Sequence, residues 1–327
     1  MHDLPDVRLI VFLVLLVAPP LAQAQHHGGA QSAPTATDSL RPSDYAVYRT
    51  GGAPAALDDV AEAMDTARVV FVGERHDDRT AHALQLRLLR RLQEQAPERA
   101  ALSLEMLARD VQPVVDEYLD SLITERHFLR ASRPWPNYRR DYHPLVRFTR
   151  SRGLPVLAAN APRRYVNRVS RLGRAALRDL PERALQWLPP LPYPQPSDAY
   201  RRRFRERMQQ AAAHHGSDGE GAHGGGGGPS MKKLLDAQAL WDATMGYALA
   251  DFLTRRPDAR VLHVAGGFHV ERGLGTPAML RRYRPGTPVL TVTMRPAGDV
   301  DAWSDEYDGL ADFVVLTRTS KPTEGTE

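Results

Sequence analysis

Residues 69–76 read VVFVGERH, so four apolar residues run directly into a Gly-Glu-Arg-His tetrapeptide. Three later stretches repeat this pattern: 101–105 (ALSLE), 155–160 (PVLAAN) and 261–269 (VLHVAGGFH). Short continuous apolar runs are typical of parallel strands that are buried on both faces. In open α/β sheets, ligands bind outside the carboxyl ends of the strands. We therefore predict that the polar residues ending these runs meet along one edge of a sheet.

Segments with helical spacing lie between the apolar runs. Residues 81–95 carry leucines four apart. Residues 144–153 begin with proline and end with glycine, and 162–172 begin with proline and are followed by Gly173. Two further candidate strands follow at 289–293 and 313–316. This alternation of strand and helix predicts βαβ units. The expected fold is a single α/β domain with a mainly parallel central sheet flanked by helices.

The first 24 residues have the features of a secretory signal peptide. The apolar block at 9–18 is shorter than the roughly 20 residues that span a bilayer, and Ala-Gln-Ala follows at 22–24. The expected organisation is a signal peptide at 1–24, a flexible leader at 25–44, the α/β domain at 45–318 and a flexible tail at 319–327.

Residues 188–230 interrupt the domain with a proline-rich stretch, a basic helical stretch and a glycine tract that carries scattered histidines. A glycine tract buries too little apolar surface to become ordered. We therefore predict a disordered Pro/Gly/His-rich insertion of low complexity at this place in the domain.

The chain contains no cysteine, which excludes disulfides, thiolate metal sites and a lipid-anchored cysteine. Together with the signal peptide, this composition predicts a periplasmic or secreted protein that is not a lipoprotein and meets a membrane only during export. The formal net charge is +4, and nearly all of the positive charge is arginine. No basic stripe is interleaved with aromatic residues, so nucleic acid is not expected as a partner.

The candidate catalytic residues at the strand ends are Glu74, His76, Glu105 and His269, with Asn160 at the end of a further strand. Carboxylate and imidazole ligands without thiolate suit Zn, Mn or Fe rather than a soft-metal site. The same groups are able to act as general acid and base without a metal. The alternative is structural: the acidic groups cap helices, and the histidines make hydrogen bonds that serve the fold.

The helix expected at 231–255 has two polar residues, Gln238 and Asp242, on an otherwise apolar stripe. Burying an unpaired carboxylate is costly, so Asp242 requires a partner. Two interpretations remain open. The carboxylate pairs with an arginine for stability, or this face borders the site and both residues orient ligand-binding groups. His82 also lies at a helix position and is expected to face solvent.

The segment 135–145 joins a loop to the start of a helix and is rich in aromatic residues. Its rings are suited to form a flat apolar wall for a planar ligand, with tyrosine hydroxyls at the edge. Packing onto the core is an equal alternative for Trp135. For Tyr138 and Tyr142 contact with the ligand is favoured.

Five motifs occur in order: 73–76 (GERH), 135–145 (WPNYRRDYHPL), 154–163 (LPVLAANAPR), 238–245 (QALWDATM) and 266–269 (GGFH). In this ordered set the chain resembles the ChaN-like haem-binding uptake family, which is part of the Tiki/TraB/erythromycin-esterase superfamily. The resemblance covers residues 45–316. It implies an α/β fold and a secreted or surface-attached protein that binds haem for iron uptake. It also implies tyrosine ligation across a homodimer, with Tyr142 as the first candidate and Tyr138 as the second.

For a haem-binding protein, arginine side chains are suited to grip the propionates. The predicted cofactor-binding residues are then Tyr142, Tyr138, Arg139, Arg140, Asn160, Gln238 and Asp242, with Arg163 and Arg164 as further arginines. More distant relatives such as Tiki use Gly-Glu-x-His and Gly-x-x-His for metal-dependent peptide cleavage. By that resemblance, the alternative function is a metal-dependent hydrolase that uses Glu74, His76, Glu105 and His269, with Glu74, His76 and His269 as the predicted metal ligands.

Overall fold

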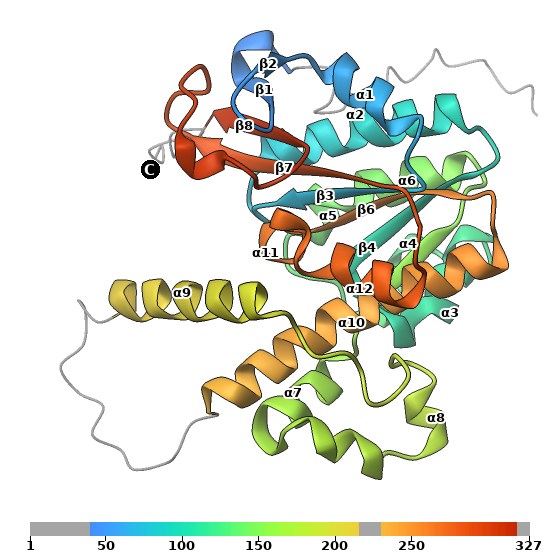
Figure 1. Cartoon of the computed structure of the whole chain (residues 1–327). Coiled ribbons are helices and arrows are strands. Elements are labelled where there is room, and N and C mark those ends of the chain that lie inside the picture. Colours follow the sequence, from blue (N-terminus) through green and yellow to red (C-terminus); the bar gives the residue numbers. More distant parts are fainter. Residues whose placement is uncertain (1–39, 216–229, 319–327) are drawn as a thin grey trace, which may run out of the picture. The chain divides into compact units, whose positions relative to one another are not determined.

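The structure of the chain, a computed structural model, describes residues 40–215 and 230–318 (Figure 1). Strand β3 (Val69–Glu74) lies inside its sheet with every residue buried. The other strands in the described ranges are β1 (Tyr45–Arg49), β2 (Pro54–Ala55), β4 (Ala100–Ala108), β5 (Val156–Asn160), β6 (Arg260–Gly266), β7 (Val289–Ala297) and β8 (Phe313–Arg318). They form one sheet in the order β2-β1-β8-β7-β3-β6-β4-β5.

The sheet is mainly parallel. Strands β8, β7, β3, β6, β4 and β5 run in the same direction, and only β1 is antiparallel to its neighbours β2 and β8. This arrangement confirms the predicted α/β class with a mainly parallel central sheet. The pairing of β1 with β8 joins the two ends of the described domain, and the sequence patterns did not indicate it.

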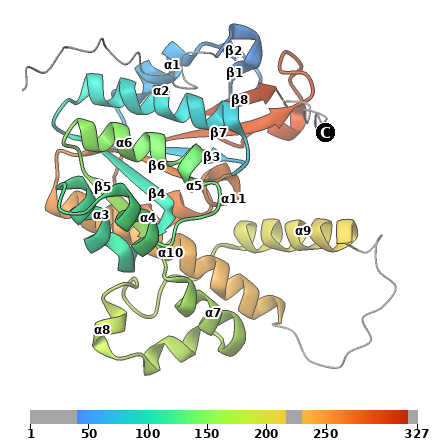
Figure 2. The same cartoon turned by 180° about the vertical axis from the view of Figure 1, so that it is seen from behind.

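Helices cover both faces of the sheet, as the two opposite views show (Figures 1 and 2). Val70 and Val72 of β3 face a core formed with helices α1 to α6, whereas Val69 and Phe71 face a core formed with α10 and α12. This division follows from the two-residue period of a strand. The helices are α1 (Leu57–Met64), α2 (Arg79–Gln95), α3 (Gln112–Leu119), α4 (Glu125–Ala131), α5 (Tyr138–Asp141), α6 (His143–Ser151), α7 (Arg163–Leu172), α8 (Glu182–Leu185), α9 (Asp198–His215), α10 (Met231–Arg255), α11 (Gly267–Val270) and α12 (Thr276–Tyr283).

The register of the sheet brings the strand ends together. Glu74 at the end of β3 pairs with Gly266 at the end of β6. Strand β4 is in regular register with β5 up to Leu104, and the register then shifts before Ala108. Such an irregularity re-aims the side chains it contains, and Glu105 lies within it. The carboxyl ends of β3, β4, β5 and β6 therefore form one edge, as expected.

Part of the predicted insertion is ordered. Residues 198–215 form helix α9, and the preceding loop is held to α10 because the hydroxyl of Tyr193 donates to the carbonyl oxygen of Asp236 at 2.8 Å. The glycine tract at 216–229 lies outside the described residues, as do the predicted signal peptide and the tail at 319–327. Within the described ranges, no helix combines the length and the apolar character needed to cross a membrane.

Candidate functional site

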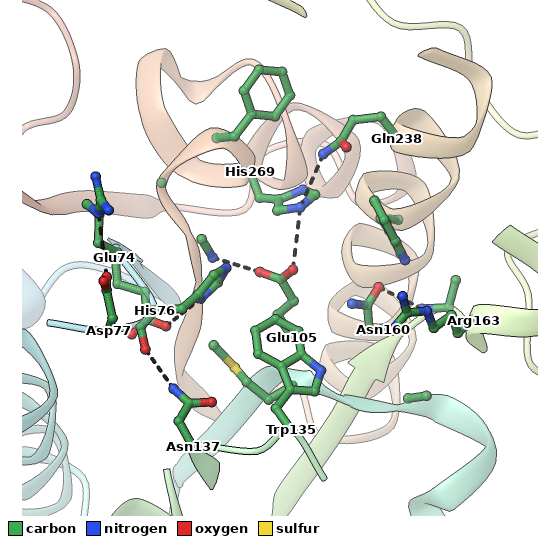
Figure 3. Close-up of a pocket in the computed structure, with 18 of the residues that line it drawn as sticks. Glu74, His76, Asp77, Glu105, Trp135, Asn137, Asn160, Arg163, Gln238 and His269 are labelled. Carbon is green, nitrogen blue, oxygen red and sulfur yellow. Dashed lines mark hydrogen bonds and ion pairs between the residues drawn. The ribbon is translucent and has the colours of Figure 1, made fainter. Parts of the chain in front are cut away.

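A cavity of about 1430 Å³ opens at the carboxyl edge of the parallel strands (Figure 3). Its volume exceeds the roughly 300–1,000 Å³ of pockets for drug-sized ligands. Its wall includes Glu74, His76, Glu105 and His269, so the fold brings together all four polar residues predicted to meet. Asn160 and Gln238 also line this cavity.

Glu74 is the buried centre of a hydrogen-bond network. Its Oε1 accepts a hydrogen bond from the hydroxyl of Tyr142 at 2.5 Å and lies 2.9 Å from Nδ1 of His76. Its Oε2 accepts from the amide of Gln85 and lies 3.3 Å from Nδ1 of His82. His82 is 6% exposed, so the prediction that it faces solvent is wrong. With these four partners, the carboxylate of Glu74 orients its neighbours and has little capacity left for a ligand.

His76 has one ring nitrogen directed toward the cavity. Nδ1 is held by Glu74, the ring edge contacts Trp135 with centroids 4.8 Å apart, and the amide of Asn137 donates to the backbone carbonyl of His76 at 2.6 Å. Nε2 makes no hydrogen bond within the described residues, and the side chain is 42% exposed. Burial opposes protonation, but the hydrogen bond to Glu74 and the charge of Glu105 outweigh it and raise the pKa of His76. Nε2 is therefore available to bind a ligand or a proton.

His269 lies on the opposite side of the Glu105 carboxylate from His76 (Figure 3). Its Nδ1 is 2.8 Å from Oδ1 of Asp242, and its Nε2 is 3.5 Å from Oε1 of Glu105 and 3.3 Å from the amide nitrogen of Gln238. Burial alone would lower the pKa of His269, but the charges of Asp242 and Glu105 raise it to about 9. At neutral pH this imidazole therefore carries a positive charge. Of the two interpretations of Asp242, the geometry matches the second, because its partner is a histidine of the site.

Gly275 allows the backbone to pass close to the buried Asp242 carboxylate. A Cβ atom at Gly275 would lie 2.4 Å from the carbonyl oxygen of His269 and 2.6 Å from Oδ1 of Asp242. Because the first is a backbone atom and the second belongs to a buried carboxylate held by His269 and Tyr200, we expect Gly275→Ala to lower the free energy of unfolding by about 1–3 kcal/mol, the usual effect of overpacking. Urea denaturation measures this change. Gly298→Ala is the matched control, because a Cβ there meets nothing within 4 Å and stability should not change. Equal stability of both variants would contradict the close packing around Asp242.

The cavity wall is rich in arginine, but most of these guanidinium groups are paired. The seven that line it are Arg75, Arg133, Arg140, Arg163, Arg164, Arg207 and Arg295. Five have carboxylate partners, namely Asp77 for Arg75, Asp110 for both Arg133 and Arg164, Asp141 for Arg140, and Glu271 for Arg295. Within the described residues, Arg163 and Arg207 form no ion pair. These two are the guanidinium groups most available to an anionic ligand.

Contrary to the prediction from the sequence, the aromatic segment 135–145 does not present its tyrosines to the ligand site. Trp135 lines the cavity, whereas Tyr138 and Tyr142 have no exposed surface and do not line it. Tyr138 begins the short helix α5 and Tyr142 caps its C-terminus four residues later, so both side chains turn into the core. Burial, reinforced by Glu74, raises the pKa of Tyr142 and keeps its hydroxyl protonated. Arg139 points away and pairs with Glu125 at 3.3 Å. The structure therefore does not bring Tyr138, Tyr142 or Arg139 to the cavity.

Other cavity residues were missed in the sequence. Phe204, Arg207 and Met208 come from α9 in the predicted insertion, and Phe268 lies between the glycines and the histidine of the GGFH motif. The spacing of Tyr200, Phe204 and Met208 at four-residue intervals is the signal that marks a buried face on α9.

The predicted metal site has no support in the geometry. Within the described residues, no group of three or more His, Asp or Glu side chains is arranged to hold a metal ion. The physical reason is that Glu74 and His269 have little capacity left for a metal ion. Both oxygens of Glu74 accept hydrogen bonds, and Nε2 of His269 lies between Oε1 of Glu105 at 3.5 Å and the side-chain amide of Gln238 at 3.3 Å.

Comparisons with known proteins identify a matching family and a solved structure of similar fold. The sequence profile of the family described as "Haem-binding uptake, Tiki superfamily, ChaN" matches residues 60–280. ChaN of Campylobacter jejuni, whose structure is described as showing cofacial haem binding, aligns with a TM-score of 0.62 over 85% of this chain and 98% of its own, at 17% identity. A variant of the erythromycin esterase EreC in its open conformation aligns with a TM-score of 0.44 over 80% of this chain and 78% of its own, at 12% identity.

One relative is similar in sequence. The chloroplastic protein RETICULATA-RELATED 5 of Arabidopsis thaliana is 25% identical over 247 residues, which are 72% of this chain and 32% of that protein. The chain thus spans about a third of the length of this relative.

Proposed function

The chain belongs to the ChaN haem-binding uptake family of the Tiki superfamily, and from this premise we propose that its cavity binds haem. The volume of about 1430 Å³ suits a ligand larger than a typical drug-sized molecule. Trp135, Trp241 and Phe268 provide aromatic surface for a planar macrocycle. The residues present therefore fit the group that the family binds.

We propose His76 as the iron ligand. The observation that supports this proposal is that His76 lines the cavity with a side chain that is 42% exposed, and that its Nε2 has no partner within the described residues, while Glu74 holds Nδ1 at 2.9 Å. A carboxylate on the second ring nitrogen is the usual support of a metal-binding histidine, because it fixes the ring and raises its basicity. Histidine is a common axial ligand of haem iron, and bound haem would supply the iron that an uptake protein carries. This assignment replaces Tyr142, whose hydroxyl is committed to Glu74 inside the core.

The test of haem binding is a titration of the purified protein with haemin, followed by absorbance in the Soret region. The proposal expects a saturable shift at a defined stoichiometry. A linear, non-saturating response equal to that of an unrelated protein would reject haem as the ligand.

We assign the anionic propionates to Arg163 and Arg207, the two lining arginines without an ion pair in the described residues. Loss of one hydrogen bond to a charged group costs about 1.5 kcal/mol, which is roughly tenfold in affinity. We expect Arg207→Gln to weaken haemin binding by about that factor in the same titration. Arg205→Gln is the matched control, because this exposed arginine on the same helix does not line the cavity. Equal losses in both variants would indicate only a general effect of charge and would contradict the assignment.

A metal-free hydrolase is the second candidate function, and one observation favours it. A histidine held by a buried carboxylate is the arrangement of a general base, and the charged His269 is suited to stabilise a developing negative charge. If this function holds, a panel of esters and peptides should include a substrate whose hydrolysis falls at least about 100-fold in His76→Gln. Haemin should then compete with that substrate, because both occupy one cavity. Turnover that persists in His76→Gln would contradict a role for this histidine as the base.

We further propose that the protein acts after export, in haem or iron uptake, and that a homodimer is its working form. The apolar block at 9–18 and the Ala-Gln-Ala at 22–24 support export. The family to which the chain belongs supports uptake. Fractionation of cells that express the chain tests export, and analytical ultracentrifugation with and without haemin tests the dimer.

A further inference from the structure

Helix α9 (Asp198–His215) contacts the site mainly through one face. Tyr200, Arg203, Phe204 and Arg207 lie at i, i+3, i+4 and i+7, so they share that face. Tyr200 and Phe204 form a small cluster with Phe268, separate from the cores on the two sides of the sheet. An element held by few buried apolar contacts opens more easily than the core does.

Two residues of this face hold His269 in place indirectly, through hydrogen bonds to Asp242 and to the turn that carries the histidine. The hydroxyl of Tyr200 donates a hydrogen bond to Oδ2 of Asp242, whose other oxygen holds Nδ1 of His269. The guanidinium of Arg203 donates to the carbonyl oxygens of Phe268 and Glu271, both at 3.0 Å, and to the carboxylate of Glu271 at 2.5 Å. The bonds from Arg203 thus hold the backbone both before His269, at Phe268, and after it, at Glu271.

The same face also supplies part of the cavity wall. Phe204, Arg207 and Met208 line the cavity, and the guanidinium of Arg207 lies 5.6 Å from the centre of the Phe268 ring. A ligand that contacts these three side chains therefore holds α9 in place. The bonds from Tyr200 and Arg203 transmit that placement to His269.

We propose that Tyr200 and Arg203 are positioning residues for His269, and that α9 couples the binding of a planar anionic ligand to the orientation of this histidine. Occupancy of the cavity and the order of α9 favour each other, as reciprocal coupling requires. The coupling rests on the proposed function, since haem is the ligand assigned to the cavity. The positioning of His269 does not depend on it, because its contacts are present without a ligand.

The positioning is tested in ligand-free protein by NMR of ¹⁵N-labelled histidine rings. Tyr200→Phe keeps the aromatic packing and removes only the hydroxyl, and Arg203→Lys keeps the charge. Both variants should shift the ring signals of His269, assigned from His269→Gln, and leave those of His76 unchanged. Arg205→Gln should shift neither. Unchanged His269 signals in a folded Tyr200→Phe and a folded Arg203→Lys would overturn the positioning role.

The coupling is tested by hydrogen exchange of α9 with haemin. At a haemin concentration 100 times Kd, exchange of the α9 amides should slow by up to about 100-fold, the linkage limit for an opening that abolishes binding. Saturable haemin binding with unchanged exchange in α9 would overturn the coupling and leave the proposed function standing. No haemin binding would remove the proposed function and the coupling together, and the ring signals of His269 would still decide the positioning role.

Discussion

Replacement of His76 with alanine is expected to weaken haemin binding at least about 100-fold without unfolding the protein. Loss of a residue that only supports a metal ligand already costs roughly 10–100-fold, so loss of the ligand itself should cost no less. The fold should survive, because the His76 side chain is 42% exposed and its network is anchored by the buried Glu74. Titration with haemin, together with the circular dichroism spectrum, measures both expectations.

Tyr142→Phe is the informative comparison for this variant. It removes the hydroxyl that Glu74 accepts at 2.5 Å but leaves His76 and the aromatic packing in place. The haemin affinity of Tyr142→Phe should therefore change by less than that of His76→Ala. In a separate variant, His76→Gly, added imidazole should restore the Soret shift. If Tyr142→Phe abolishes the shift and His76→Ala keeps it, ligation belongs to the tyrosine and the assignment to His76 is wrong.

The charged His269 should make stability depend on pH. Its pKa is about 9 in the folded protein and about 6.5 in an unfolded chain. Because the folded value is the higher one, the stabilisation is fully present below pH 6.5 and is lost as the pH rises through 9. A shift of this size corresponds to about 3 kcal/mol. The facing charges that produce it are Asp242 from α10 and Glu105 from β4, and Arg203 from α9 opposes them.

His269→Gln isolates this contribution. The difference in unfolding free energy between the wild type and this variant should be largest near pH 6 and should shrink by about 3 kcal/mol by pH 10, as measured by urea denaturation. His76 also has a raised pKa and contributes in the same direction in both proteins, but the charge of His269 lowers that pKa, so the His76 contribution cancels only in part from the difference. A difference that stays constant over this range would show that His269 is not charged in the folded protein.

Much of the fold and the four central residues of the site are predictable from the sequence for one physical reason. Parallel strands buried on both faces read as short apolar runs, and their carboxyl ends share an edge. The pattern VVFVGE therefore predicts strand β3 and puts Glu74 at the carboxyl edge of the sheet, where it lines the cavity. The position of β6 between β3 and β4 was not predictable, because it depends on pairing between segments far apart in the chain.

The details of the site depended on tertiary packing that composition does not reveal. Tyr138 begins α5 and Tyr142 follows its last residue, four positions later, so both side chains lie in the core, and Trp135 is left at the cavity. Arg140 pairs with its neighbour Asp141, whereas Arg207 comes from the basic helical stretch of the predicted insertion, which the sequence did not assign to the site. Which arginine is free to hold an anion is thus decided by the positions of carboxylates from other elements.

The structure of the haemin complex tests the central claim most directly, because the anomalous signal of iron locates the metal without ambiguity. Iron bonded to Nε2 of His76, with the macrocycle against Trp135 and its propionates near Arg163 and Arg207, is the predicted result. Iron bonded to Tyr142 or Tyr138, or haem bound outside the cavity, would contradict it.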